Sequence, residues 1–97
     1  MTLSRFAPHK GKRDANEQQI RDELADAGWL TQPISCEDWP DLLAFKGGRI
    51  HLVEVKTEDG RLDGGQKAVI ALLALFGVKV IVCRTSLEFL RAVGDVS

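Results

Sequence analysis

The stretch that decides the fold is Pro40–Lys56, which reads PDLLAFKGGRIHLVEVK. Two mostly apolar runs flank the pair Gly47-Gly48, and glycines allow the positive φ angles that a two-residue hairpin turn requires. The sequence therefore predicts an antiparallel β-hairpin in which Lys46 pairs with Arg49. Both faces of this hairpin are largely apolar, so we expect its two strands to lie in the interior of a sheet.

Counting outward from the turn places Asp41 opposite Glu54, at the open end of the hairpin. Directly opposed like charges destabilise a sheet, and a buried charge is costly unless it is paired or bound to a metal. Lys56 lies on the same face as Glu54 because side chains alternate along a strand. The alternative is an exposed Glu54–Lys56 pair at a strand end. The apolar surroundings favour a cation site instead.

The residue types at this end of the hairpin indicate which metal it would bind. Two carboxylates, backbone carbonyls and water suit a hard divalent ion, either Mg²⁺ or Mn²⁺. Lys56 can then stabilise negative charge on a phosphate. Zinc is not expected, because His51 points to the opposite face in this register and His9 lies close to the N-terminus.

Helices and further strands are expected on both sides of the hairpin. The predicted order is αβββαβα, an α/β fold with a mixed sheet flanked by helices. The expected outer strands cover Trp29–Ile34, an edge strand, and Val78–Arg84, a strand buried on both faces. The expected helices cover Asp14–Ala27, Gln66–Phe76 and the residues that follow the cap Thr85 as far as Val93.

The second predicted helix is apolar almost all round, reading AVIALLALF over residues 68–76. The chain has 97 residues, which is one small domain. One face of the helix can pack on the sheet, and the other face then needs a second partner surface. A homodimer is the simplest source of that surface. The alternative is that the first or the last helix covers it.

The charges of the chain are distributed unevenly, although the net charge is only −1. Residues 1–13 contain four basic side chains and no acidic one, whereas the remaining chain has nine basic and fourteen acidic residues. This basic arm can contact nucleic-acid phosphates through Lys10, Lys12 and Arg13. The alternative is that the arm is a solvated tail.

Composition and targeting signals suggest where the protein works. No apolar run is long enough to span a membrane, and the N-terminus lacks the apolar core of a signal peptide. Cys36 and Cys83 show no metal-type or redox-motif spacing, and Cys83 lies in an apolar run that predicts a buried thiol. We therefore expect a cytoplasmic, intracellular protein.

Glu17 and Gln66 each allow two interpretations. Glu17 follows Asp14 at the spacing of a helix N-cap and can serve the start of the helix alone. Gln66 opens the second helix, where it can hydrogen-bond a nucleic-acid phosphate or a water molecule on a metal. Residue type alone favours a structural role for both.

Together these residues resemble the VRR-NUC branch of the PD-(D/E)XK nuclease superfamily. The segments that match are Asn16-Glu17-Gln18, Pro40-Asp41-Leu42, Leu52–Lys56 and Leu62–Gln66. The resemblance covers about Asp14 to Arg84, and it implies a restriction-endonuclease-like core within a nuclease domain at 14–97. Asp63 departs from the pattern, because a small hydroxyl residue is common there.

The resemblance also implies a role for each residue of the site. Asp41 and Glu54 would bind the catalytic metal, with the Val55 carbonyl as a further ligand. Lys56 would be the catalytic lysine. Glu17 would bind or position metal and water, and Gln66 would complete the site.

By the same resemblance, the chain is expected to be a Mg²⁺-dependent, structure-selective DNA endonuclease, a homodimer that resolves Holliday junctions. A nuclease acting on flaps, single strands or plain duplex is the alternative within the same chemistry. The alternative from another class is a non-catalytic DNA-binding or assembly module with this fold.

Overall fold

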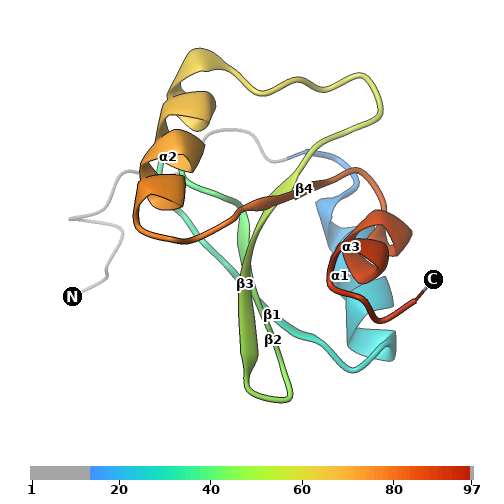
Figure 1. The fold of residues 1–97 in the computed structure, drawn as a ribbon. Coiled ribbons are helices and arrows are strands. Elements are labelled where there is room, and N and C mark those ends of the chain that lie inside the picture. The colour runs from blue at the N-terminus through green and yellow to red at the C-terminus, as the bar shows by residue number, and fades with distance from the viewer. Residues whose placement is uncertain (1–13, 97) are drawn as a thin grey trace, which may run out of the picture.

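The structure is a computed structural model that describes residues 14–96. The predicted basic arm, with Lys10, Lys12 and Arg13, therefore lies outside the described residues, as does His9. Within the described part, the elements follow the predicted order αβββαβα (Figure 1). The helices are α1 Glu17–Asp26, α2 Gly64–Leu75 and α3 Ser86–Ala92, and the strands are β1 Leu30–Pro33, β2 Leu42–Lys46, β3 Arg49–Val55 and β4 Ile81–Cys83.

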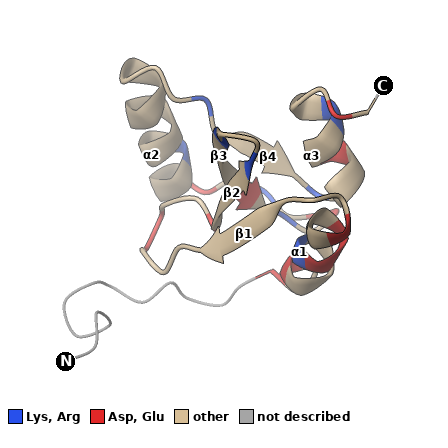
Figure 2. Ribbon diagram, turned by 90° about the horizontal axis from the view of Figure 1, so that it is seen from below, with Lys and Arg blue, Asp and Glu red and all other residues tan. Residues whose placement is uncertain are grey.

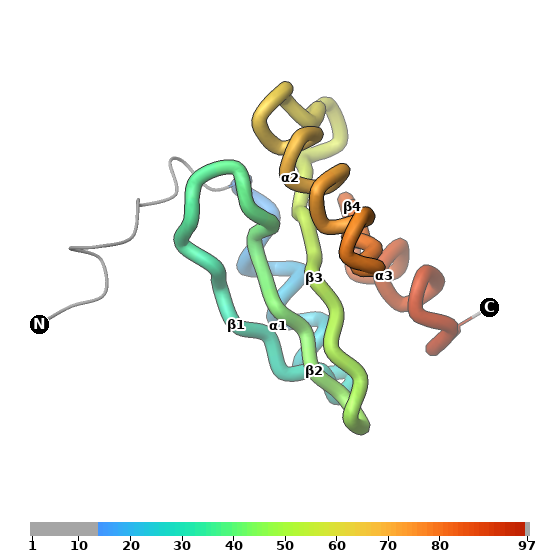
Figure 3. Tube along the Cα trace, turned by 60° about the vertical axis from the view of Figure 1, so that its left-hand side comes forward, coloured from blue at the N-terminus to red at the C-terminus, as the bar shows by residue number. Residues whose placement is uncertain are grey.

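The four strands form one mixed sheet in the order β1-β2-β3-β4. Strands β1, β2 and β3 are antiparallel neighbours that run side by side (Figure 3), and β4 is parallel to β3. The hairpin has the predicted register, with Lys46 opposite Arg49, and Gly47 and Gly48 have φ angles of 56° and 80°. The two hairpin strands are therefore interior strands, as the sequence predicted.

One face of the sheet forms the core. Helices α1 and α3 pack on each other on this side, with α1 against β1 and α3 against β4. They cover the inward side chains of the hairpin, which alternate with the residues of the opposite face. The cluster of buried apolar residues comprises Ile20, Leu24, Trp29, Leu42, Ala44, Val53, Val55, Ile81, Cys83 and Phe89.

Helix α2 lies on the other side of the sheet from α1 and α3 (Figures 1 and 2). Although nearly all of its residues are apolar, none is buried within the described structure, and α2 makes no extensive contact with another described helix or strand. The alternative in which the first or last helix covers its extra face is therefore wrong. The apolar surface of α2 remains exposed in the single chain.

Several predicted boundaries were wrong. Helix α1 begins at Glu17, and its N-cap position is Asn16 rather than Asp14. Strand β4 is shorter than predicted and lies at the sheet edge. Its residues Ile81 and Cys83 are buried in the core, whereas Val82 on the opposite face is only half-buried, so the strand is not buried on both faces. The reason is that α2 does not cover this part of the sheet.

The cap of α3 is also only partly as predicted. The Thr85 hydroxyl accepts from the Glu88 N–H at 3.1 Å, which confirms Thr85 as the cap and forms one half of a capping box. The Glu88 carboxylate, however, accepts from the Arg84 N–H at 2.6 Å instead of reaching back to Thr85.

The C-terminal segment is fastened to the hairpin turn by one carboxylate. Asp95 accepts from the Trp29 indole at 2.9 Å and from the Arg49 guanidinium at 3.0 Å, and Lys46 lies 3.4 Å away. The Arg49 guanidinium also lies 4.9 Å from the centre of the Trp29 ring. These hydrogen bonds, first from Trp29 and then from Arg49, lower the pKa of Asp95 below its ordinary value. We refer to the cluster of Asp95, Trp29, Arg49 and Lys46 as the C-terminal latch.

No helix in residues 14–96 is long and apolar enough to cross a bilayer.

Candidate functional site

The buried charged side chains of residues 14–96 are four in number, and the sequence singled out all of them. Glu54 is 1% exposed, Asp41 5%, Glu17 6% and Lys56 8%. Burying a charge costs several kcal/mol unless it is paired, so a small domain retains such groups only where they are stabilised or used. Four of them in one domain identify the candidate site.

Asp41 lies at the end of the hairpin that is opposite the turn. It lies one residue beyond the last β2–β3 pair, Leu42 with Val53, and its N–H donates to the Val53 carbonyl at 2.9 Å. Its carboxylate accepts from the Val55 N–H at 2.7 Å. The side chain is therefore held in place across the hairpin, beside the end of the strand that carries Glu54.

Glu54 and Lys56 share one face of β3 and its extension. The Lys56 ammonium lies 3.5 Å from Glu54 Oε2. The Lys56 N–H donates to the Cys83 carbonyl at 3.0 Å, which fixes the backbone of Lys56 against β4. Glu54 and Lys56 therefore lie on the same face of the sheet, as predicted.

Gln66 reaches this pair from the first turn of α2. Its side-chain amide donates to Glu54 Oε2 at 3.3 Å. The side-chain oxygen of Gln66 accepts from the Asp63 backbone N–H at 3.1 Å. In return, the Asp63 carboxylate accepts from the Gln66 backbone N–H at 2.8 Å. This reciprocal capping box was not predicted, although its Asp-x-x-Gln spacing is visible in the sequence. It explains why α2 begins two residues earlier than expected.

Glu17 is the first residue of α1, and the residue before it ties this helix to the site. The Asn16 amide donates to the carbonyls of Lys56 at 3.0 Å and Arg84 at 2.9 Å. Asn16 therefore joins the ends of β3 and β4 and makes no side-chain cap of its own. No local pattern could have found this role, because both partners are distant in sequence.

The donor set fits a hard divalent ion. Asp41 and Glu54 are buried carboxylates at one end of the hairpin, and Mg²⁺ is commonly held by one or two carboxylates while it keeps several waters. Within the described residues, no three Asp, Glu, His or Cys side chains are close enough to hold a metal ion. Glu17 is therefore not gathered with the other two into a three-carboxylate cluster, and its metal role stays a prediction.

Two of the described residues that suit softer metals, His51 and Cys83, are placed elsewhere or held neutral. His51 packs against Trp29 and Phe89, on the core face, as the register predicted. Burial, then the charges of Glu88, Asp41 and Glu54, raise the pKa of Cys83 to about 12. This buried thiol is therefore neutral at physiological pH and lacks the thiolate character of a nucleophilic cysteine.

Comparison with protein families gives one match. A family model described as the VRR-NUC domain matches residues 11–87, which is most of the chain. No curated protein and no solved structure shows a significant match. The matched range contains every residue of the candidate site, from Glu17 to Gln66.

Proposed function

We propose, since this chain belongs to the VRR-NUC domain family of nucleases, that it is a Mg²⁺- or Mn²⁺-dependent, structure-selective DNA endonuclease. The observation that carries this proposal is the buried set of Glu17, Asp41, Glu54 and Lys56. Asp41, Glu54 and Lys56 at the end of the interior hairpin, with Glu17 at the start of α1, are the residue types that metal-dependent phosphodiester hydrolysis uses. Burying these charges has a desolvation cost that a purely structural module could avoid with apolar residues of similar size.

Asp41 and Glu54, with the Val55 carbonyl, would hold the divalent ion, and Glu17 would help to position it. When bound, such an ion withdraws negative charge from the scissile phosphate and activates water. The hydrogen bond from Gln66 to Glu54 and that from Val55 to Asp41 keep both carboxylates in fixed orientations. Fixed orientation matters because pre-positioned groups need no reorganisation during the reaction.

Lys56 supplies a fixed positive charge beside these carboxylates. Its ammonium is held 3.5 Å from Glu54 and is largely withdrawn from water, which strengthens its interaction with a phosphate. It would stabilise the negative charge that develops on the phosphate oxygens as water attacks the phosphorus. Gln66, at the start of α2, could also donate the second N–H of its amide to a DNA phosphate while the first stays on Glu54.

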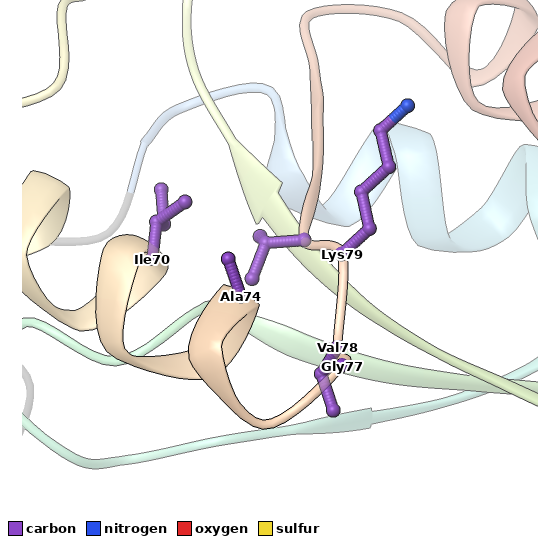
Figure 4. Close-up of a pocket in the computed structure, with 6 residues that line it drawn as sticks. Ile70, Ala74, Gly77, Val78 and Lys79 are labelled. Atoms are coloured by element: carbon purple, nitrogen blue, oxygen red, sulfur yellow. The ribbon is translucent and has the colours of Figure 1, made fainter.

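The exposed face of α2 supports the homodimer. Leu75 is 84% and Phe76 79% exposed, and Lys67 is the one charged residue within the bounds of α2. Beside the end of α2 lies a hollow of 440 Å³, lined by Ile70, Ala74, Gly77, Val78, Lys79 and Val80. Figure 4 shows Ile70 and Ala74 at this hollow, with Lys79 extending away from the helix. A second copy would cover this surface.

A homodimer would account for a branched substrate. Two copies related by a two-fold axis present two equivalent sites. A Holliday junction has paired strands of the same symmetry, so two symmetric nicks would resolve it. This is the substrate that we propose.

The basic arm would supply contacts to the DNA backbone. Lys10, Lys12 and Arg13 stand a few residues before Asn16 in the sequence, and the Asn16 amide donates to the Lys56 carbonyl. The rest of the chain carries more acidic than basic residues, so local positive charge would be needed to attract DNA.

Cleavage of a labelled substrate panel tests the proposal. Four-way junction, flap, single-stranded and duplex DNA are incubated with Mg²⁺, with Mn²⁺ and with chelator. We expect metal-dependent nicking that is fastest on the junction, and no cleavage by Asp41→Ala or Lys56→Ala. Asp26→Ala, which removes an exposed acid of α1, is the matched control and should cut like wild type.

Each other result has a defined meaning. Equal cleavage by wild type, Asp41→Ala and Lys56→Ala would show that the assigned site is wrong. Preference for flaps, single strands or duplex would replace the resolvase with the other nuclease. Absence of cleavage, together with absence of divalent binding by calorimetry, would favour the non-catalytic module.

A further inference from the structure

Asp38 has the most unusual backbone of the described chain. Among residues 14–96 it is the one non-glycine residue with a positive φ angle, at 68°. This left-handed conformation is disfavoured for residues with a Cβ, although Asp tolerates it better than most. Such strain persists only where the surroundings hold it, and it is common at functional sites. Asp38 precedes Asp41 by three residues, with Trp39 and the buried Pro40 between them.

The side chain of Asp38 occupies the space that a side chain at Gly65 would need. A Cβ built on Gly65 would lie 2.5 Å from Asp38 Cγ and from both of its carboxylate oxygens. Gly65 has no positive φ, so the lack of a side chain at this position serves the close approach of Asp38 and not a turn. The contact also places a negative charge at the positive end of the α2 dipole.

This contact joins the two segments that carry the site. Gly65 lies in the first turn of α2, directly before Gln66, whose amide bonds Glu54. Because α2 buries no residue and has no extensive contact with other described elements, few interactions fix the position of its first turn. The Asp38–Gly65 contact and the Gln66–Glu54 bond are two such interactions, and one supports the other.

We infer that Asp38 is a positioning residue for the nuclease centre. Its carboxylate, seated against Gly65, holds the first turn of α2 and thereby keeps the Gln66 amide on Glu54. The strained φ of Asp38 is the cost of aiming the carboxylate at that turn. This inference rests on the proposed function, because it assigns Asp38 a part in setting the same site.

Three variants separate the carboxylate from the backbone strain. Asp38→Gly relieves the strained φ and removes the carboxylate, Asp38→Asn keeps the shape and an oxygen acceptor, and Gly65→Ala inserts the Cβ that displaces the carboxylate. We expect kcat for junction cleavage to fall roughly ten- to a hundredfold in Asp38→Gly and Gly65→Ala, because displaced groups lose their alignment. KM for DNA should stay near wild type, and Asp38→Asn should recover most of kcat. Asp59→Ala, an exposed acid of the neighbouring loop, is the matched control.

The double variant gives the sharpest test. With the carboxylate already absent, Gly65→Ala has room for its Cβ, so it should cause no further loss of kcat in the Asp38→Gly background. It should instead raise Tm there, because Ala favours helix over Gly. Independent losses from the two substitutions, or wild-type kcat in Asp38→Gly, would overturn the inference.

A readout without metal or DNA separates this inference from the proposed function. The side-chain amide signal of Gln66, assigned by its loss in Gln66→Ala, should shift and exchange faster in Asp38→Gly and Gly65→Ala, but not in Asp59→Ala. An unchanged signal would overturn the positioning role even if wild type cuts DNA. A shifted signal with an inactive wild type would keep the Asp38–Gln66 linkage and reject the nuclease.

Discussion

The carboxylate of Asp41 accepts the N–H of Val55 at 2.7 Å, across the open end of the hairpin. A side chain therefore takes the place of a backbone carbonyl where the ladder of β2 and β3 ends. This single contact both completes the hydrogen bonding of a buried strand and fixes the orientation of a proposed metal ligand. The two roles can be separated by substitution.

Asp41→Asn and Asp41→Ala should differ in stability but not in activity. Asn retains an oxygen for the Val55 N–H, whereas Ala leaves that buried donor without its partner, which costs about 1–3 kcal/mol. Both remove the carboxylate, so both should abolish cleavage. Urea unfolding measures the difference in the free energy of unfolding. Equal stability of the two variants would show that the Val55 contact contributes nothing.

The Asp41→Asn variant also tests metal binding through stability. A ligand that binds only the folded state stabilises it by about 2.7 kcal/mol at one hundred times its dissociation constant. Saturating Mg²⁺ should therefore raise Tm of wild type and leave Tm of Asp41→Asn nearly unchanged. The control is Asp26→Asn, for which Mg²⁺ should raise Tm as in wild type.

Lys56→Met should reduce cleavage by about a hundred- to a thousandfold, the usual effect of removing one group that stabilises transition-state charge. It should also lower the free energy of unfolding by about 3–5 kcal/mol without metal, because it breaks a buried ion pair with Glu54. Cleavage rates and chemical denaturation give the two values. Lys67→Met, at an exposed lysine of α2, should change neither by a comparable amount.

The C-terminal latch should make stability depend on pH in the acid range. The pKa of Asp95 is lowered in the folded protein, so its carboxylate stabilises the fold above its ordinary pKa of about 4. That contribution is lost as the pH falls through the lower, folded-state pKa. Tm of wild type should therefore exceed that of Asp95→Asn at neutral pH, and the difference should shrink below about pH 4. A difference that does not change with pH would contradict this assignment.

Glu substitutions on α2 should dissociate the proposed dimer. Leu75→Glu or Phe76→Glu places a charge on an apolar surface that a second copy would bury, at a large desolvation cost. Sedimentation at several concentrations should show a dimer for wild type and a monomer for each variant. Leu87→Glu introduces the same charge at an exposed leucine of α3, and it should remain dimeric. A wild type that is monomeric at every concentration would remove the structural support for the resolvase.

The sequence predicted the interactions that are local or follow from register. Gly47 and Gly48 specify the turn, and the turn specifies the pairing of Lys46 with Arg49. Because side chains alternate along a strand, His51 and Glu54 then lie on opposite faces of β3. The order of elements also follows from local patterns. The four buried charges could be named because each stands at the end of a hairpin or helix with a recognisable pattern.

The contacts that the sequence did not predict join residues far apart in the chain. Asn16 bonds carbonyls 40 and 68 residues away, and Trp29 bonds Asp95 66 residues away. Only the assembled fold brings such pairs together. The burial of β4 was overestimated for a related reason, because burial of its second face depends on whether α2 covers the sheet.

The two tryptophans give the molecule separate optical reporters. Trp29 lies in the core, edge-on to Phe89 at 4.9 Å and bonded to the latch. Trp39 is 36% exposed, and it stands between the strained Asp38 and the carboxylate of Asp41. Fluorescence from Trp29 follows the integrity of the fold, and fluorescence from Trp39 follows events at the site. In Trp29→Phe, the remaining emission therefore comes from the neighbourhood of the proposed metal alone, and ligand titrations can be recorded there without any attached dye.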